Sequence, residues 1–272
     1  MICVYLCLSV VDSSFNMTRR RFYAPPIAFS HDGQSATLSA DETRHLRDVL
    51  RLRVGDEAYV FDGEGREFRG SVSNTDRNSS VLRIIEKAQP LGPESPLNLT
   101  LAVALLKGEK FDVVVQKATE LGAICVVPLI TSRADVRIHN PEDSQKKQAR
   151  WQRIALAATK QCGRAKLIQI DAPVAFAEFV ARPPVNPAVD NELCLMFSER
   201  NGNPLADAVD SIAQAESVKA IVGSEGGWTD EEIQQASTAQ WKIVTLGGRT
   251  LRAETAAIVV AALLQHRFGD LR

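Results

Sequence analysis

The chain has 272 residues, of which 45% are hydrophobic and 24% charged, and these ordinary globular values exclude wholesale disorder and fibrous repeats. Its 32 lysines and arginines almost balance 33 aspartates and glutamates, which excludes a protein that is basic throughout but not a local basic patch. The five cysteines and four histidines are scattered without a C-x-x-C pair, so we expect buried thiols and no metal site.

Two apolar stretches do not have the properties of membrane segments. Residues 256–264 fall far short of the roughly 20 residues that a helix needs to cross a bilayer. Residues 1–11 have no preceding positive charge and are followed by Asp12, unlike a secretory signal. We therefore predict a cytoplasmic protein that does not enter a membrane, with Met17 as its natural start and residues 1–16 as a non-native stretch upstream of it. Residues 1–17 together are expected to form a disordered extension before the first folded domain.

Short strands separated by glycine and asparagine turns characterise residues 18–89. The segments with strand character are residues 20–23, 36–38, 57–61, 67–72 and 81–85. One helix is expected from Asp41 to Leu52, with Leu46, Val49 and Leu50 at the i, i+3, i+4 positions of an apolar face. So many short strands close together predict a small β-barrel.

A different pattern begins after residues 90–96, which hold three prolines and form a stiff linker. Strands then alternate with helices to the end of the chain. The strands are expected at 97–106, 124–130, 167–170, 192–197, 219–223 and 242–246, and the clearest helices at 110–121, 141–162 and 253–268. Continuously apolar strands are typical of a parallel sheet covered on both faces, so residues 97–272 are predicted to form an α/β domain.

Two glycine-rich turns lead directly from a predicted strand into a predicted helix, at 222–229 and 246–255. Thr229 and Glu232 have the spacing of a capping box, which places a helix immediately after the first turn. Glycines at the carboxyl end of a parallel strand let the backbone approach a ligand closely. Neither turn matches a phosphate loop or G-x-G-x-x-G. One such turn can be a mere connection, but two in successive units favour a ligand site.

The sequences at the two turns are GSEGGWTDEEI and VTLGGRTLRAETAA. They resemble the signature of the RsmE family of SPOUT (trefoil-knot) methyltransferases. In that family the corresponding motifs are usually GPEGG and LGPRxLRxETA. Residues 107–110 with 116–122 are similar to the family's KG-(D/E)-K…QKxxELG block. Residues 151–164 resemble its W-x-x-I-x-x-A-x-x-Q-x-x-R block. Residues 20–23 and 45–51 match its N-terminal barrel, so the resemblance extends from Thr18 to Leu271.

The resemblance implies an enzyme that transfers a methyl group from S-adenosyl-L-methionine to N3 of a uridine in 16S ribosomal RNA. It also implies a homodimer, whose substrate is the 16S rRNA or the 30S subunit. The expected fold class is α/β, with a mostly parallel C-terminal SPOUT trefoil-knot domain (97–272) preceded by a small PUA-like, RNA-binding β-barrel (18–89). Two other readings stay open: a SPOUT methyltransferase for another RNA position, and a non-catalytic RNA-binding protein of the same fold.

The family's cofactor loops fall on three predicted strand ends of this chain. The residues expected to bind the cofactor are Met196, Phe197, Ser198, Glu199, Gly223, Ser224, Glu225, Gly226, Gly227, Leu246, Gly247, Gly248, Leu251 and Thr255. Ser224 and Gly248 stand where the family usually has proline, so we expect less preorganised loops and weaker cofactor affinity rather than lost activity.

Arg252 and Glu225 are the candidate catalytic residues. A guanidinium at the mouth of the cleft can stabilise the uridine anion or hold a phosphate. The structural alternative is an ion pair of Arg252 with Glu254 or Glu225. Two interpretations of Glu225 stay open. It contacts the cofactor or the base, or it accepts hydrogen bonds from backbone N–H groups at the start of the helix.

Residues 19–53 carry a local excess of positive charge, with seven arginines and four acidic residues, as an RNA-binding surface would. The residues expected to contact RNA are Arg19, Arg20, Arg21, Arg47, Arg51, Arg133 and Arg249. A solvated face is the alternative for such a charge run. For Arg164 a structural role is favoured over RNA contact, because this residue follows a helix end and can bind the terminal carbonyls.

The last predicted helix, residues 253–268, is apolar nearly all round its middle. Such a helix lies deep in a core or between subunits. Because the resembled family dimerises, we expect part of this helix to meet its twin across a two-fold axis.

Overall fold

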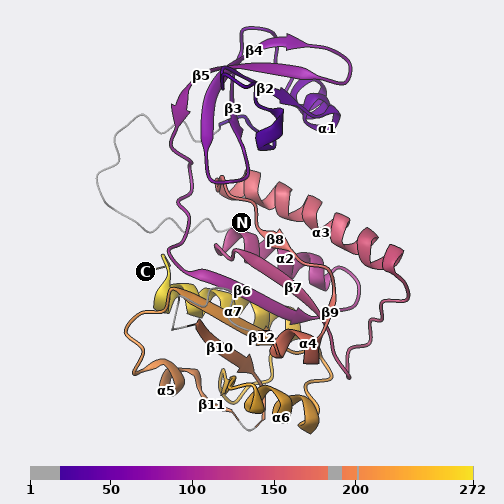
Figure 1. Cartoon of the computed structure of the whole chain (residues 1–272), viewed down its shortest axis with the longest axis vertical. Coiled ribbons are helices and arrows are strands. Elements are labelled where there is room, and N and C mark those ends of the chain that lie inside the picture. Colours follow the sequence, from indigo (N-terminus) through magenta and orange to yellow (C-terminus); the bar gives the residue numbers. More distant parts are fainter. Residues whose placement is uncertain (1–18, 183–191, 201, 272) are drawn as a thin grey trace. The chain divides into compact units, whose positions relative to one another are not determined.

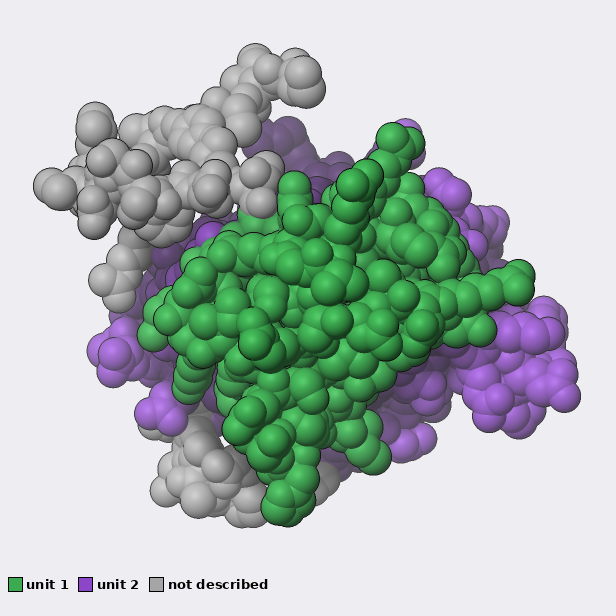
Figure 2. All heavy atoms as spheres, turned by 90° about the horizontal axis from the view of Figure 1, so that it is seen from above, with its two compact units in different colours: residues 1–89 green, residues 90–272 purple. Residues whose placement is uncertain are grey.

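The computed structural model describes residues 19–182, 192–200 and 202–271. The chain forms two compact units that divide between Gln89 and Pro90, and Figure 2 colours them separately. The division lies at the first proline of the segment 90–96, where the missing backbone donors interrupt strand pairing. The extension predicted for residues 1–17 lies outside the described residues.

The first unit is built on a five-stranded sheet that curls around its own core (Figure 1). Its strands are β1 (Arg21–Tyr23), β2 (Ser35–Leu38), β3 (Glu57–Phe61), β4 (Glu67–Thr75) and β5 (Ser80–Ala88), in the order β1-β3-β4-β5-β2. Only the β1–β3 pairing in this described sheet is parallel. Phe22, Val60 and Leu82 fill the concave side, so alternating apolar residues produce the expected barrel-like unit.

The helix predicted for residues 41–52 is divided. Ser39 caps α1 (Ala40–Arg44) by accepting a hydrogen bond from the backbone N–H of Glu42, at 3.4 Å. A π-helical turn, His45–Val49, follows, with a 3.0 Å bond from the N–H of Leu50 to the carbonyl of His45. The wider turn rotates the side chains that follow it. Leu46 is buried as predicted, but Val49 is 64% exposed, and its place on an apolar face was wrong.

The second unit contains an eight-stranded sheet in which every described pairing is parallel. Its strands are β6 (Asn98–Ala104), β7 (Cys125–Ile130), β8 (Gln169–Ile170), β9 (Val174–Ala175), β10 (Glu192–Phe197), β11 (Asn203–Pro204), β12 (Ser217–Val222) and β13 (Lys242–Thr245). The order is β11-β13-β10-β12-β6-β7-β8, and β9 also pairs with β7. The predicted parallel sheet is confirmed.

Helices cover both faces of this sheet (Figure 1). They are α2 (Lys110–Glu120), α3 (Pro141–Cys162), α4 (Phe176–Val180), α5 (Leu205–Val209), α6 (Asp230–Thr238) and α7 (Ala253–Phe268). Helices α2, α3 and α7 share one core with β6 and β12, whereas α4 and α6 pack on the other face. Asn140 caps α3 and Gly163 ends it at φ 89°, so the local signals of this helix are confirmed.

The described cysteines, Cys125, Cys162 and Cys194, form no disulfide. Burial raises the pKa of the Cys125 thiol to about 12 and that of Cys194 to about 11, so both remain protonated at neutral pH. Within the same described ranges, no three histidine, cysteine or carboxylate side chains gather as a metal site would require. No described helix combines the length and apolar character needed to cross a membrane.

Candidate active site

Three neighbouring strands of the large sheet end side by side. β10 pairs with β12 on one side and with β13 on the other, and all three run parallel. Their carboxyl ends therefore bring residues 197–199, 222–228 and 245–251 together, although these segments are far apart in the chain. Ligands of open α/β sheets bind at this edge of the strands.

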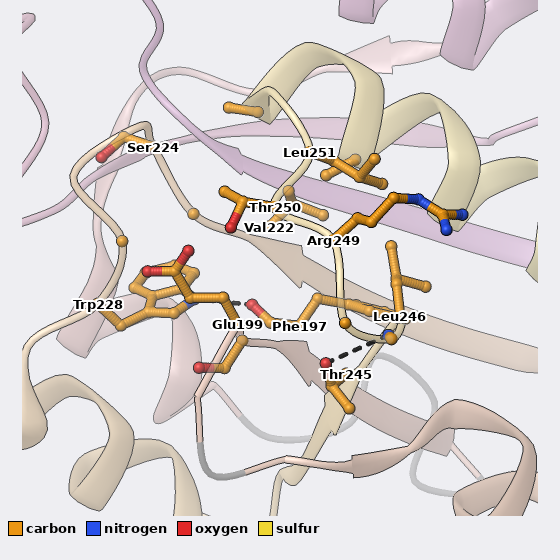
Figure 3. A pocket seen from close by; sticks show the side chains of 17 residues that line it. Phe197, Glu199, Val222, Ser224, Trp228, Thr245, Leu246, Arg249, Thr250 and Leu251 are labelled. Carbon is orange, nitrogen blue, oxygen red and sulfur yellow. Dashed lines mark hydrogen bonds between the residues drawn. The ribbon is translucent and has the colours of Figure 1, made fainter.

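An open cleft of about 790 Å³, including solvent at its mouth, lies between these segments (Figure 3). Ten residues that we expected to bind the cofactor line the cleft: Phe197, Ser198, Glu199, Gly223, Ser224, Gly227, Leu246, Gly247, Gly248 and Leu251. Arg249, expected to contact RNA, also lines it. The predicted cofactor set left out Val222, Trp228, Thr245, Thr250, Ala253 and Ala256, which also line the cleft. Four of these, Val222, Trp228, Thr250 and Ala253, lie within the two predicted glycine turns, whereas Thr245 and Ala256 lie outside them.

Four residues of the expected cofactor set do not line the cleft: Met196, Glu225, Gly226 and Thr255. The assignment of Met196 was wrong, because its side chain is fully buried in the core beneath α4 and α6. Side chains alternate along a strand, so Met196 points to the opposite face from Phe197. This alternation was visible in the sequence. Glu225, Gly226 and Thr255 are exposed outside the cleft.

Trp228 forms one wall of the cleft and joins two of its three segments. Its indole Nε1 donates a 2.8 Å hydrogen bond to the carbonyl of Phe197, drawn as a dashed line in Figure 3. Only 3% of Trp228 is exposed. A Cβ on Gly223 would lie 3.0 Å from the indole ring, so a larger residue at position 223 would displace Trp228. The glycine is therefore explained by close packing.

The glycine turn after β12 is also held from outside, by the loop that follows β7. The Ser224 hydroxyl donates to the carbonyl of Arg133 at 3.3 Å, and Arg133 Nη1 donates to the carbonyl of Gly226 at 3.3 Å. A Cβ on Gly226 would approach the Arg133 carbonyl to 2.8 Å. The Glu232 carboxylate accepts a 2.8 Å bond from the N–H of Ser132. These contacts hold the turn at Ser224, where the family usually has proline, against the loop after β7.

Glu225, which follows the cleft residue Ser224, forms an ion pair with Lys110 in the first turn of α2. The Lys110 ammonium holds the pKa of Glu225 below its usual range, and the pKa of Lys110 is raised in return. The start of α6 is capped by Thr229 and Glu232, so Glu225 is not needed there. The sequence placed Lys110 in a family block but offered no sign of this partner.

Arg252 occupies the N-cap position of α7 with an exposed side chain. Within the described chain it makes no ion pair with Glu225, which binds Lys110, or with Glu254, whose buried Oε2 has no hydrogen-bond partner. The structural alternative for Arg252 is therefore not supported. Its guanidinium lies outside the cleft and is accessible to a large substrate.

The arginines expected to contact RNA differ in their environments. Arg21 is buried, and its guanidinium binds both carboxylate oxygens of Glu67, at 3.2 and 2.8 Å. The RNA contact predicted for Arg21 was therefore wrong, because this side chain balances a buried carboxylate. Arg19 also reaches Glu67, at 3.4 Å, and Arg47 pairs with Asp48 at 2.7 Å. The remaining side chains, those of Arg20, Arg51, Arg133 and Arg249, are exposed.

Arg164 has a structural role, in agreement with the alternative favoured for it. It is buried and donates to the carbonyls of Thr119 and Ala123, at 2.8 and 3.0 Å, around the end of α2. The same guanidinium pairs with Glu94, at 2.8 Å. These carbonyls lie in the last turn of α2 and in the loop just after it, not at the end of the helix that precedes Arg164 in the chain.

Comparison with known proteins agrees with this geometry. A family model described as an RNA methyltransferase domain matches residues 93–265, and one described as an RNA methyltransferase PUA domain matches residues 38–85. The chain is 36% identical to the ribosomal RNA small subunit methyltransferase E of Synechocystis, over 92% of this chain and 78% of that protein.

Solved structures show the same likeness. A Legionella pneumophila methyltransferase in complex with SAM is 34% identical, with a TM-score of 0.82 over 93% of this chain and 100% of that one. The ribosomal RNA small subunit methyltransferase E of Neisseria gonorrhoeae, bound to S-adenosyl methionine, is 31% identical, with a TM-score of 0.82 over 94% and 100%. The chain belongs to the RsmE family of RNA methyltransferases, and its units have the PUA-like and SPOUT trefoil-knot folds.

Proposed function

We propose that this protein transfers a methyl group from S-adenosylmethionine to N3 of a uridine in the 16S rRNA of the small ribosomal subunit. The observation that carries the proposal is the cleft at three adjacent strand ends, in a chain whose relatives are named for small-subunit rRNA methylation. The substrate is the rRNA itself or the 30S subunit. We place the reaction in the cytoplasm.

The composition of the cleft fits S-adenosylmethionine. Leu246 and Leu251 offer an apolar surface of the kind that an adenine ring needs, and Gly223 and Gly247 present backbone without side chains. The cleft also holds one carboxylate, Glu199, and one guanidinium, Arg249, among its lining residues. These charges complement the ammonium and carboxylate of the methionine part. We assign the ten cleft residues of the expected set, with Arg249, to cofactor binding.

Neighbouring glycines of the second turn are expected to respond differently to alanine. Gly247 has φ 117°, which a residue with a side chain adopts only with strain, on the order of 1–3 kcal/mol. A Cβ on Gly248 would meet nothing within 4 Å, and its φ is not in the positive range. Gly247→Ala should therefore weaken cofactor binding, measured by calorimetric titration, whereas Gly248→Ala should leave it unchanged or tighter. Equal effects of the two substitutions would contradict this account.

The cofactor supplies an electrophilic methyl group on a sulfonium. The protein has to hold N3 of the uridine in line with this methyl group and to help the N3 proton leave to solvent. Arg252, exposed and without an ion pair to any described residue, is positioned to stabilise the negative charge that the uridine carbonyls develop. Glu225, kept ionised by Lys110, is assigned to accept a hydrogen bond from the N3–H of the uridine before this proton leaves to solvent.

The ion pair of Lys110 with Glu225 predicts a change in pH dependence. A carboxylate whose pKa is lowered stays ionised to lower pH, and removing its cationic partner returns the pKa towards the ordinary value of about 4.3. Lys110→Ala should therefore move the acid limb of kcat/KM to higher pH, and Lys110→Arg should leave it in place. An acid limb that does not respond to Lys110→Ala would show that ionised Glu225 is not required.

We also propose a homodimer, in which α7 meets its twin. Leu263 is 40% exposed on this helix, and Ile258, Val259 and Ala262 beside it are only half-buried. A second subunit would cover this apolar strip, which a monomer leaves in contact with water. Light scattering at micromolar concentration should give twice the chain mass, and a monomer would overturn the assignment.

The decisive experiment is methyl transfer from labelled cofactor to 30S subunits and, in parallel, to free 16S rRNA. The RNA is then digested to nucleosides, and the methylated nucleoside is identified by mass spectrometry. Label in 3-methyluridine supports the proposal. Label in another nucleoside indicates a SPOUT methyltransferase of different specificity, and RNA binding without transfer indicates a non-catalytic relative. Both of those results would overturn it.

A further inference from the structure

The outer face of α3 carries a row of positive charge that the site described above does not use. Lys146, Arg150, Arg153 and Lys160 are spaced i, i+4, i+7 and i+14, which puts them on one face of a helix. The opposite face is the buried one and holds the residues Trp151, Ala155, Ala158 and Thr159. The cations therefore point away from the core of their own unit.

This charge is segregated within its unit. Residues 144–166 contain seven lysines and arginines and no carboxylate, whereas the rest of residues 90–272 contain 13 lysines and arginines and 21 carboxylates. Like charges at i, i+4, such as Lys146 and Arg150, destabilise a helix. A helix selected for stability alone would place acids among these cations, as the remainder of the unit does.

Only part of the row is neutralised by neighbouring carboxylates. Arg150 pairs with Asp112 of α2, and Lys147, beside the row, pairs with Asp143 at 3.6 Å. Lys146 and Arg153 are exposed, and neither forms an ion pair with any residue that the structure describes. These two side chains are the free cations available to a charged partner.

The row is connected to the candidate active site. Helix α3 packs along α2 (Figure 1), and Arg150 binds Asp112 in the first turn of α2. The same turn contains Lys110, which pairs with Glu225 in the glycine turn of the cleft. Two ion pairs and the first turn of α2 therefore connect the middle of the basic row with the glycine turn beside the cleft.

We propose that this face, through the exposed side chains of Lys146, Arg150 and Arg153, binds the phosphate backbone of the substrate RNA beside the target nucleotide. From Lys146 to Arg153 the helix rises about 10 Å, at about 1.5 Å per residue, so these side chains can contact neighbouring phosphates of one strand. Lysine and arginine side chains form charge-assisted hydrogen bonds with phosphate oxygens, and such contacts hold a strand in place without reading its sequence. The surface therefore fixes the position of the RNA, while the cleft selects the base. The inference rests on the proposed function.

The test measures how binding of a 16S rRNA transcript depends on salt. Each phosphate contact contributes about 0.7–0.9 to the slope of log K against log salt concentration. The double substitution Lys146→Ala with Arg153→Ala should reduce the slope by about 1.4–1.8. Alanine is favourable in an exposed helix, so the variant should fold, and its affinity for S-adenosylmethionine should equal that of the wild type.

Two matched variants complete the experiment. Lys242→Ala removes an exposed lysine at the amino end of β13, away from the cleft, and should leave the slope unchanged. A variant that keeps both positive charges but exchanges the side chains, Lys146→Arg with Arg153→Lys, should have most of the wild-type slope. An unchanged slope in the double alanine variant overturns the proposal, as does an equal loss in Lys242→Ala. Loss of binding to phosphatidylserine vesicles without a change in the RNA slope also overturns it, because the partner would then be a membrane.

The outcomes separate this inference from the proposed function. If the wild type methylates the RNA and the double alanine variant has the same salt slope as the wild type, only the RNA-binding role proposed for α3 is wrong. If the wild type transfers no methyl group, the proposed function is wrong, and the salt slopes still decide whether α3 binds RNA.

Discussion

Trp228→Ala is expected to destabilise the protein by about 3–5 kcal/mol and to abolish binding of S-adenosylmethionine. Trp228 is almost fully buried, and its ring packs against Phe176 at 5.1 Å between centroids. Its removal leaves a cavity in the core and also removes one wall of the cleft. Urea unfolding measures the loss of stability, and calorimetric titration measures the loss of cofactor binding.

Trp228→Phe is the matched control. It keeps an aromatic ring but removes the indole N–H, so the carbonyl of Phe197 loses its 2.8 Å hydrogen bond. An unsatisfied buried carbonyl costs about 1–3 kcal/mol, so this variant should be destabilised less than Trp228→Ala and should retain weakened cofactor binding. If Trp228→Ala bound the cofactor with wild-type affinity, the cleft described here would not be the cofactor site.

Arg252→Ala is expected to lower kcat by roughly 10²–10³-fold, the usual effect of removing one group that stabilises developing negative charge. Its affinity for S-adenosylmethionine should not change, because Arg252 does not line the cleft. Arg252→Lys should recover part of the rate, since it restores the charge without the planar guanidinium. Single-turnover methyl transfer to RNA measures the chemical step, and titration of the cofactor measures affinity.

Arg249→Ala provides the comparison for Arg252, because the two arginines are three residues apart on the same turn. Arg249 lines the cleft, so its loss should weaken the binding of S-adenosylmethionine and leave the chemical step of saturated enzyme nearly unchanged. An Arg252→Ala variant with normal kcat and weak cofactor binding would exchange the two assigned roles and would refute the catalytic one.

The local features of this protein were determined by its sequence. Helix α3 begins after Asn140 and ends at Gly163, because an N-cap side chain and a left-handed glycine each act within one helical turn. The capping box of Thr229 and Glu232 formed for the same reason. Two glycine turns and apolar strands were enough to predict a parallel sheet with a ligand site at strand ends, and the family blocks identified the kind of enzyme.

Only the tertiary structure decided which distant residues meet. The order β13-β10-β12 brings three loops into one cleft, and no local pattern encodes the order of strands in a sheet. Lys110 and Glu225 are 115 positions apart, and Arg21 and Glu67 are 46 apart, so neither pair was visible from spacing. A charge run predicts solvent or RNA contact for Arg21, but the cost of burying Glu67 without a partner places this arginine in the interior. Helix propensity and capping depend on residues within one turn, whereas contacts between distant residues depend on the path of the whole chain.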